Sequence, residues 1–171
     1  MDIHRRLEEV FSEEEIKVPF LHGVVRDKNS PVVIGLLLSW IECGTENLEC
    51  ILSSESETPS LLREQWWSQI SHTIIRLHDA GIVLGDAKAT NILIGGRSKD
   101  AWIIDFGGGF THGWVEESQM ETVEGDLAAL AEIKELLEPE RSLKKRALEE
   151  SDEIFETKKS CAEDTLELSS K

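Results

Sequence analysis

The sequence of 171 residues predicts an α+β fold. Two apolar, β-branched runs, Phe20–Arg26 and Val32–Trp40, flank a polar turn, which is the pattern of a β-hairpin. A later segment repeats its apolar residues at three- and four-residue spacing, which indicates a long helix with one buried face. Short strand-like runs and a second apolar helix follow it. Small sheets and helices are therefore expected in one chain.

The residues before the long helix predict a first helix, the hairpin and a short second helix. The segment Asp2–Glu15 is charged and ends before Pro19, but its apolar residues share one helical face. We expect Glu42–Thr45 to break the second strand of the hairpin and Glu46–Leu52 to form the short helix. The apolar face of the first helix consists of Ile3, Leu7, Val10 and Phe11.

The long helix has a start signal, a stop signal and a continuous apolar stripe. Thr58 suits the N-cap, and Pro59 suits the first helical position because its missing N–H has no partner there anyway. Gly81 suits the C-terminal stop. The stripe consists of Leu62, Trp66, Ile70, Thr73, Ile74 and Leu77.

The segment after the long helix predicts three short strands and one more helix. The strand-like runs are Ile82–Leu84, Ile92–Ile94 and Trp102–Ile104, and a turn rich in glycine and polar residues joins the last two. An apolar helix over Leu127–Leu137 stops near a proline.

Charge and cysteine content limit the classes of partner and the cellular compartment. The formal net charge of −16 would repel phosphate backbones and anionic lipids, so neither nucleic acid nor a membrane is an expected partner. The longest apolar stretch, Val32–Ile41, is too short to span a bilayer. Three unpatterned cysteines indicate reduced thiols, which predicts a cytoplasmic protein with the nucleus as the alternative. The run Lys144–Arg146 could act in nuclear import, although a solvated helix face is the favoured interpretation.

Two short segments carry residues suited to phosphoryl transfer. The first holds Asp86, Lys88 and Asn91, and the second, fourteen residues past Asn91, reads Asp105-Phe106-Gly107. Transfer of a γ-phosphoryl group depends mostly on positioning and on neutralising charge. Asp86 is placed to accept the proton of an attacking hydroxyl, and Lys88 to neutralise charge on the transferred phosphate. Oxygens of Asn91 and Asp105 suit Mg²⁺, and a hairpin between them would bring the two together.

Each of these residues has a simpler interpretation when it is taken alone. Asp86 could be a turn residue, Lys88 a solvated charge, Asn91 a loop cap and Asp105 the end of a strand. Their joint order and spacing, with a helix before and a hairpin between, favour the phosphoryl-transfer interpretation. The five histidines, by contrast, show no metal-ligand spacing.

With this motif, the stretch from about Pro19 to Leu137 resembles the protein-kinase superfamily, and within it the small, divergent kinase-like proteins common in filamentous fungi. The resemblance implies ATP as the phosphate donor and Mg²⁺ as the metal. It also implies a hinge in which Leu38 is the gatekeeper and backbone groups near Ser39 and Ile41 contact adenine. Asp126 matches the aspartate that braces the catalytic loop in the family, and it could also serve as a helix N-cap.

The resemblance implies a protein-kinase-like fold with a reduced small lobe. Residues 1–38 would form a partial N-lobe consisting of a short hairpin and one helix. Residues 39–137 would form the front half of the helical C-lobe, with the catalytic loop and the Asp-Phe-Gly segment. Residues 138–171 are highly charged and predict a helical or disordered tail.

The sequence departs from the kinase pattern upstream of the hinge and just before Asp86. Leu84-Gly85 stands where the family has His-Arg, which implies no phosphorylation switch of the activation loop. No G-x-G-x-x-G precedes the hinge, and Lys17 and Lys28 lie where neither suits the phosphate-binding role. Glu8 or Glu9 could be a remnant of the ion-pair acid of the family, but a surface acidic run is the favoured interpretation.

Three hypotheses therefore remain open from the sequence. The first is a phosphotransferase that moves the ATP γ-phosphate to a hydroxyl of a protein or a small molecule. The second is a truncated, non-catalytic module of the pseudokinase type that binds partners or nucleotide, and the third is a partial gene product. A small sheet would also expose apolar surface, which a protein partner could cover.

Overall fold

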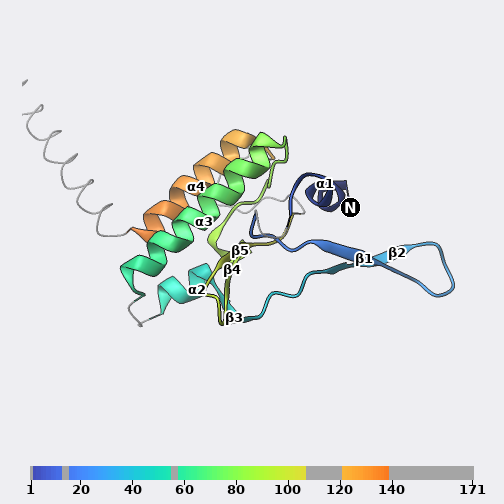
Figure 1. Ribbon diagram of the computed structural model, residues 1–171, viewed down its shortest axis with the longest axis horizontal. Helices are drawn as coiled ribbons and strands as arrows, with labels where there is room; N and C mark the ends of the chain where they lie inside the picture. The colour runs from blue at the N-terminus through green and yellow to red at the C-terminus, as the bar shows by residue number, and fades with distance from the viewer. Residues whose placement is uncertain (1, 13–15, 55–57, 107–120, 139–171) are drawn as a thin grey trace, which may run out of the picture. The chain divides into compact units, whose positions relative to one another are not determined.

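The computed structural model describes residues 2–12, 16–54, 58–106 and 121–138. They belong to the first of two compact units, Met1–Leu137, except for Glu138, which begins the second unit, Glu138–Lys171. The predicted tail and Gly107 lie outside the described residues. The described part has the predicted α+β fold, with two small antiparallel sheets and four α-helices (Figure 1). Its elements are α1 (Asp2–Val10), β1 (Leu21–Arg26), β2 (Val33–Leu38), β3 (Cys43–Asn47), α2 (Leu48–Ser53), α3 (Ser60–Asp79), the 3₁₀ turn η1 (Ala89–Asn91), β4 (Ile92–Gly95), β5 (Ala101–Ile103) and α4 (Val123–Leu137).

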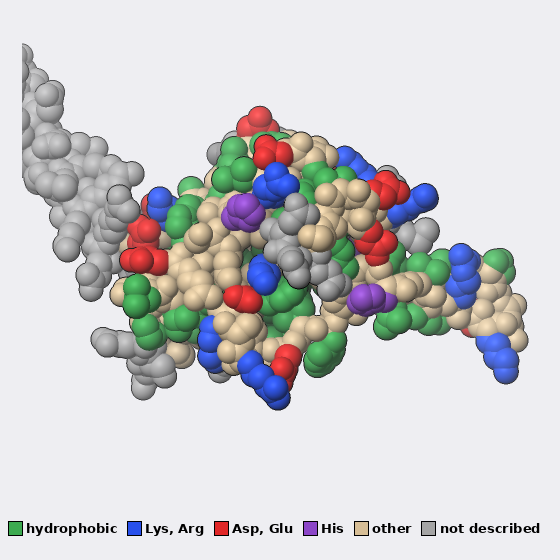
Figure 2. Space-filling model, in the orientation of Figure 1, with side chains coloured by type: hydrophobic (Ala, Val, Ile, Leu, Met, Phe, Trp, Pro, Cys, Tyr) green, Lys and Arg blue, Asp and Glu red, His purple; other side chains and the backbone are tan. Residues whose placement is uncertain are grey.

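Strands β1 and β2 form the predicted hairpin, which extends as an arm from the rest of its unit (Figure 1). The strands are antiparallel, and Leu21 pairs with Leu38 at the base of the arm. Hydrophobic side chains are exposed along it (Figure 2), for example Ile34 at 63% and Leu37 at 57% of their full accessible area. The expected exposure of apolar surface on this sheet is therefore confirmed.

Strand β2 ends at Leu38, before the expected break at Glu42–Thr45, but part of that segment begins a further strand, β3, that was not predicted. Cys43 pairs with Gly95 and Asn47 with Leu93, so β3 is the outer strand of the sheet β3-β4-β5. Pairing with β4 outweighs the weak strand propensity of this segment. The reason is that β4 gives its backbone N–H and C=O groups hydrogen-bond partners in place of the water that they lose on folding. The predicted short helix follows as α2, and Asn47 caps it by accepting a 2.9 Å hydrogen bond from the Cys50 N–H.

Helix α3 is the predicted long helix, although its cap is not the predicted one. Pro59 occupies the N-cap position and makes no side-chain cap bond, so the assignment of Thr58 as the cap was wrong. The predicted stripe is buried from Trp66 to Leu77. Gly81 ends the helix at φ +68°, a left-handed conformation that glycine adopts without steric cost.

The segment after α3 forms two of the three expected strands. Ile82–Leu84 is not a strand, because the N–H of Leu84 donates to the Asp126 carboxylate and not to a neighbouring strand. Strands β4 and β5 pair antiparallel as predicted, with Ile92 opposite Ile103. Helix α4 begins four residues before the predicted start at Leu127 and packs along α3 (Figure 1).

The first helix joins the same core. Leu7 and Phe11 are buried with the apolar stripe of α3, and the Arg6 guanidinium donates to the Ala80 carbonyl at 2.9 Å. Helix α1 ends at Val10 and is thus shorter than predicted. Glu9 pairs with Arg5 at 3.2 Å on the exposed face, as the favoured surface interpretation expected.

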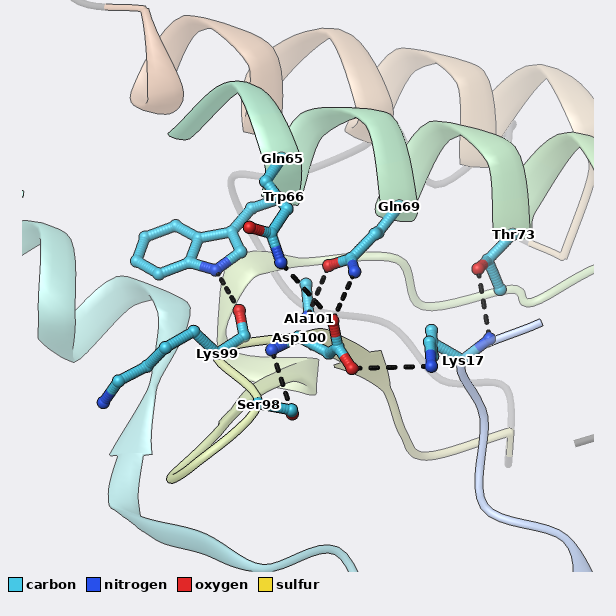
Figure 3. A network of polar contacts seen from close by, with 9 residues as sticks. All are labelled: Lys17, Gln65, Trp66, Gln69, Thr73, Ser98, Lys99, Asp100 and Ala101. Carbon is cyan, nitrogen blue, oxygen red and sulfur yellow. Dashed lines mark hydrogen bonds and ion pairs between the residues drawn. The ribbon is translucent and has the colours of Figure 1, made fainter. Parts of the chain in front are cut away.

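A polar network fixes the β4–β5 turn against α3 (Figure 3). Asp100 accepts a 2.6 Å hydrogen bond from the Gln69 amide and lies 3.4 Å from the Lys17 ammonium. The Trp66 indole N–H donates to the Lys99 carbonyl at 2.7 Å. Burial alone would raise the pKa of Asp100, but the Gln69 and Ser98 hydrogen bonds and the Lys17 charge outweigh it and hold the pKa below its ordinary value.

Asp100→Asn is expected to lower the free energy of unfolding by about 1 kcal/mol near neutral pH and by much less in acid. Because the pKa of Asp100 is lower in the folded chain, its carboxylate contributes stability above the unfolded value of 3.8, and this stability is lost as the pH falls through the folded pKa. Urea unfolding at several pH values measures the difference, with Glu64→Gln on the exposed face of α3 as control. An effect of equal size at neutral and acid pH would contradict the stabilising role given to the ionised Asp100 carboxylate.

Candidate active site

One cavity of about 580 Å³ lies between the hairpin, the β3-β4-β5 sheet and α1. A volume of this size is ordinary for a small-molecule site. Its lining is mainly apolar and comes from segments far apart in the sequence. They are the end of β2 with the linker to β3 (Leu36, Leu38, Ser39, Trp40, Ile41 and Cys43), β4 (Leu93), the segment after β5 (Ile104, Asp105 and Phe106), and His4 and Pro19.

The predicted hinge residues line this cavity. Leu38, Ser39 and Ile41 all contribute to the wall. The Ser39 N–H is already used, because it donates to the Phe20 carbonyl at 2.8 Å. The Ile41 carbonyl accepts from the Cys43 N–H at 2.8 Å, whereas the Ile41 N–H makes no hydrogen bond to any residue that the structure describes. A backbone donor is therefore available to a ligand at the hinge.

Asp86, Lys88 and Asn91 form a compact cluster beside the cavity. The Lys88 ammonium donates to Asp86 Oδ2 in a close ion pair. The Asn91 amide nitrogen donates to the Asp86 carbonyl at 3.0 Å and to Asp86 Oδ2 at 3.3 Å. Asp86 and Asn91 are both buried, so these bonds fix the orientation of the Asp86 carboxylate in a site with little competing water.

The β4–β5 hairpin sets the backbone of Asn91 opposite Ile104, the residue before Asp105. The Ile104 N–H donates to the Asn91 carbonyl at 2.9 Å and so extends the β4–β5 ladder by one step. Ile104 and Asp105 line the cavity, whereas Asp86, Lys88 and Asn91 are not among its lining residues. A backbone hydrogen bond thus joins the segment that carries Asn91 to the segment that carries Asp105.

Asp105 has a strained backbone, and its side chain differs in exposure from that of the next residue, Phe106. Its φ of +65° lies in the left-handed region, which costs a non-glycine residue about 1 kcal/mol or more. The Asp105 side chain is exposed while Phe106 is buried against the His4 ring, with centroids 5.8 Å apart. Burial lowers the pKa of His4, which favours the neutral imidazole at this contact. Such strain is typical of functional sites.

Asp126 holds the loop that precedes Asp86. It is 2% exposed, and its carboxylate accepts from the N–H of Leu84 at 2.8 Å and of Gly85 at 2.9 Å. His78 Nε2 lies 2.8 Å from the same carboxylate. Gly85 has φ +85°, so the loop needs a glycine there. Because Asp126 lies inside α4, the N-cap alternative was wrong and the bracing role implied by the resemblance matches the geometry.

The predicted metal ligands have the right chemistry for Mg²⁺. The Asn91 amide nitrogen is used by Asp86, which leaves the amide oxygen as the atom for a cation, and Asp105 supplies a carboxylate. Two such oxygens, completed by phosphate and water oxygens, suit Mg²⁺. Within the described residues no group of three or more His, Cys, Asp and Glu side chains could hold a metal without such help.

Comparison with protein families decides the identity of the fold. A sequence model of the Lipopolysaccharide kinase (Kdo/WaaP) family matches residues 11–138, which is most of the chain. The chain belongs to this family. Comparison with curated proteins gave no match.

Membership of the Kdo/WaaP family confirms the predicted protein-kinase superfamily and the kinase-like fold. The family is one of kinase-like phosphotransferases, and the matched range contains all the predicted site residues. The roles of Asp86, Lys88, Asn91, Asp105, Ser39 and Ile41 stay predictions. No helix in the described ranges has the length and apolarity to cross a membrane.

Sequence reasoning missed two features of this Kdo/WaaP family member. No role was predicted for His78, which contacts the buried carboxylate of Asp126. His4 was not expected to contact Phe106. The position of His78 in the last turn of α3, shortly before Asp86, was the available signal for the Asp126 contact. Nothing in the sequence pattern signalled the contact between His4 and Phe106.

Proposed function

We propose that this protein transfers the γ-phosphoryl group of ATP, in the presence of Mg²⁺, to a hydroxyl of a protein or a small molecule. The observation that carries the proposal is that the predicted hinge residues and Asp105 line the same cavity. It is supported by the ladder bond from Ile104 to Asn91, which sets the Asp86 cluster beside that cavity. The family description names lipopolysaccharide kinases, so a saccharide hydroxyl is one acceptor to test.

Each predicted residue has a role in this reaction. Asp86 accepts the proton of the attacking hydroxyl while the new O–P bond forms and the bond to the ADP oxygen breaks. Lys88 neutralises charge on the transferred phosphoryl group, which frees Asp86 from its ion pair as the phosphate arrives. Asn91 and Asp105 hold Mg²⁺, which neutralises the phosphates when bound. Backbone groups at Ser39 and Ile41 bind the adenine edge.

Mg-ATP is expected to stabilise the wild-type protein and to stabilise Asp105→Asn far less. A ligand that binds only the folded state raises the free energy of unfolding by about 2.7 kcal/mol at 100 times its Kd. Asparagine tolerates a positive φ, so this variant removes the charge without adding backbone strain. Thermal unfolding with and without Mg-ATP measures the effect.

The matched control is Asp79→Asn, which makes the same chemical change at an exposed position on α3. No stabilisation of the wild type at millimolar nucleotide would reject the enzyme proposal. Equal stabilisation of the wild type and Asp105→Asn would reject only the metal assignment.

A non-catalytic binding module is the second candidate, and one observation favours it. None of the described residues that line the cavity is a lysine or arginine, and Lys17 faces Asp100 and the Trp102 ring instead. Lack of an oriented cation on the nucleotide phosphates costs ~3–4 kcal/mol of transition-state stabilisation, or on the order of 10²–10³ in rate. Nucleotide binding without phosphate transfer to any tested hydroxyl would support this candidate.

Two further predictions concern the surroundings of the protein. We propose that a protein partner covers the exposed apolar surface of β1 and β2.

We also propose a cytoplasmic location, with the nucleus as the alternative. Fractionation of the cells that produce the chain tests the location.

A further inference from the structure

Trp40 is the most exposed of the large hydrophobic side chains in the described part of the chain. It retains 88% of its full accessible area. It lies in the linker between β2 and β3 and contributes to the lining of the cavity. An indole is a large, flat apolar surface, so leaving it in water at the mouth of a cavity loses the stabilisation that burial would bring.

The residues that line the cavity beside Trp40 suit a flat heteroaromatic ring. Leu38, Leu93 and Ile104 supply apolar walls, and their side chains offer no hydrogen bond. The available backbone donor at the hinge is the N–H of Ile41, the residue next to Trp40. A planar ring with an acceptor on its edge would use both features, since the edge meets the donor and the apolar faces meet the walls.

We propose that Trp40 stacks on the base of the bound nucleotide and makes the site select purines over pyrimidines. This inference rests on the proposed function, because it names a specificity residue for the same cavity. The physical reason is contact area: a purine presents two fused rings to the indole and a pyrimidine presents one. Every base has a π-face and can stack on an aromatic side chain, and preferences between bases come from the strength of stacking. The larger apolar area that a purine removes from water makes its stack the stronger one.

Trp40→Ala is expected to weaken Mg-ATP binding roughly ten-fold or more, and Trp40→Phe to restore most of the affinity. In the wild type Mg-ATP should bind more tightly than Mg-CTP, and in Trp40→Ala the two affinities should approach each other. Equilibrium dialysis measures both nucleotides. Because Trp40 is so exposed, the unfolding temperature of the free protein should not change. Leu61→Ala, an exposed apolar truncation on α3, is the matched control.

Tryptophan fluorescence gives a second readout. A stacked base is expected to quench Trp40, so Mg-ATP should quench the wild type but not Trp40→Phe, even though both bind. Unchanged Mg-ATP affinity in Trp40→Ala, or equal wild-type affinities for Mg-ATP and Mg-CTP, would overturn the stacking proposal and leave the proposed function standing. A wild type that binds no Mg-ATP would overturn both.

Discussion

Asp86→Asn is expected to reduce phosphate transfer by about 10²–10⁴-fold, because an amide cannot accept the proton of the attacking hydroxyl. Asparagine keeps the shape of the side chain and an oxygen that can still accept from the Asn91 amide. The Kd for Mg-ATP should change little, since Asp86 does not line the cavity. The loss should therefore appear in kcat and not in nucleotide affinity.

Single-turnover transfer from labelled ATP to a panel of hydroxyl acceptors measures this effect. Asp79→Asn is again the control, because it makes the same change on an exposed face of α3. A measured turnover equal to that of the wild type would remove Asp86 as the base. The free protein should be compared at the same time by thermal unfolding, since the variant also leaves the partly buried Lys88 without its ion pair.

Asp126→Ala is expected to lower the free energy of unfolding by about 3–5 kcal/mol. The carboxylate is 2% exposed and accepts from the backbone N–H groups of Leu84 and Gly85. Alanine would leave the buried Leu84 N–H and the partly buried Gly85 N–H and His78 without this acceptor, and each buried group so left costs about 1–3 kcal/mol. The loop that precedes Asp86 would lose the hydrogen bonds that hold Leu84 and Gly85 in place.

Urea unfolding measures this loss, and Asp79→Ala on the exposed face of α3 is the control. A double-mutant cycle with His78→Ala separates the histidine contact from the two backbone bonds. A loss below about 1 kcal/mol for Asp126→Ala would show that the loop holds its conformation without the carboxylate.

Local patterns in the sequence predicted the elements whose stability comes from neighbours along the chain. The stripe of α3 follows from helical spacing, and the β1–β2 and β4–β5 hairpins follow from apolar runs around polar turns. Pairing of β4 with β5 sets Asn91 opposite Ile104, the residue before Asp105, so this backbone arrangement was predictable from spacing alone.

Elements that depend on distant partners were not predicted. Strand β3 exists because β4 offers it a pairing edge, despite Gly44 within it. Residues 82–84 looked like a strand by composition, yet the Ile82 N–H donates to the Leu77 carbonyl and the Leu84 N–H to the Asp126 carboxylate. In both cases the backbone hydrogen bonds are decided by what the tertiary fold brings near, and propensity is the weaker effect.

By itself the sequence determined the family motif, the order of helices and hairpins and the pairing of the segments that carry Asn91 and Asp105, because these rest on spacing and local hydrogen bonding. Only the tertiary structure decided that the hinge and Asp105 share one cavity, that Trp40 lies at its edge and that Asp126 and His78 hold the loop. Those arrangements depend on contacts between residues far apart in the chain, whose geometry no local pattern encodes.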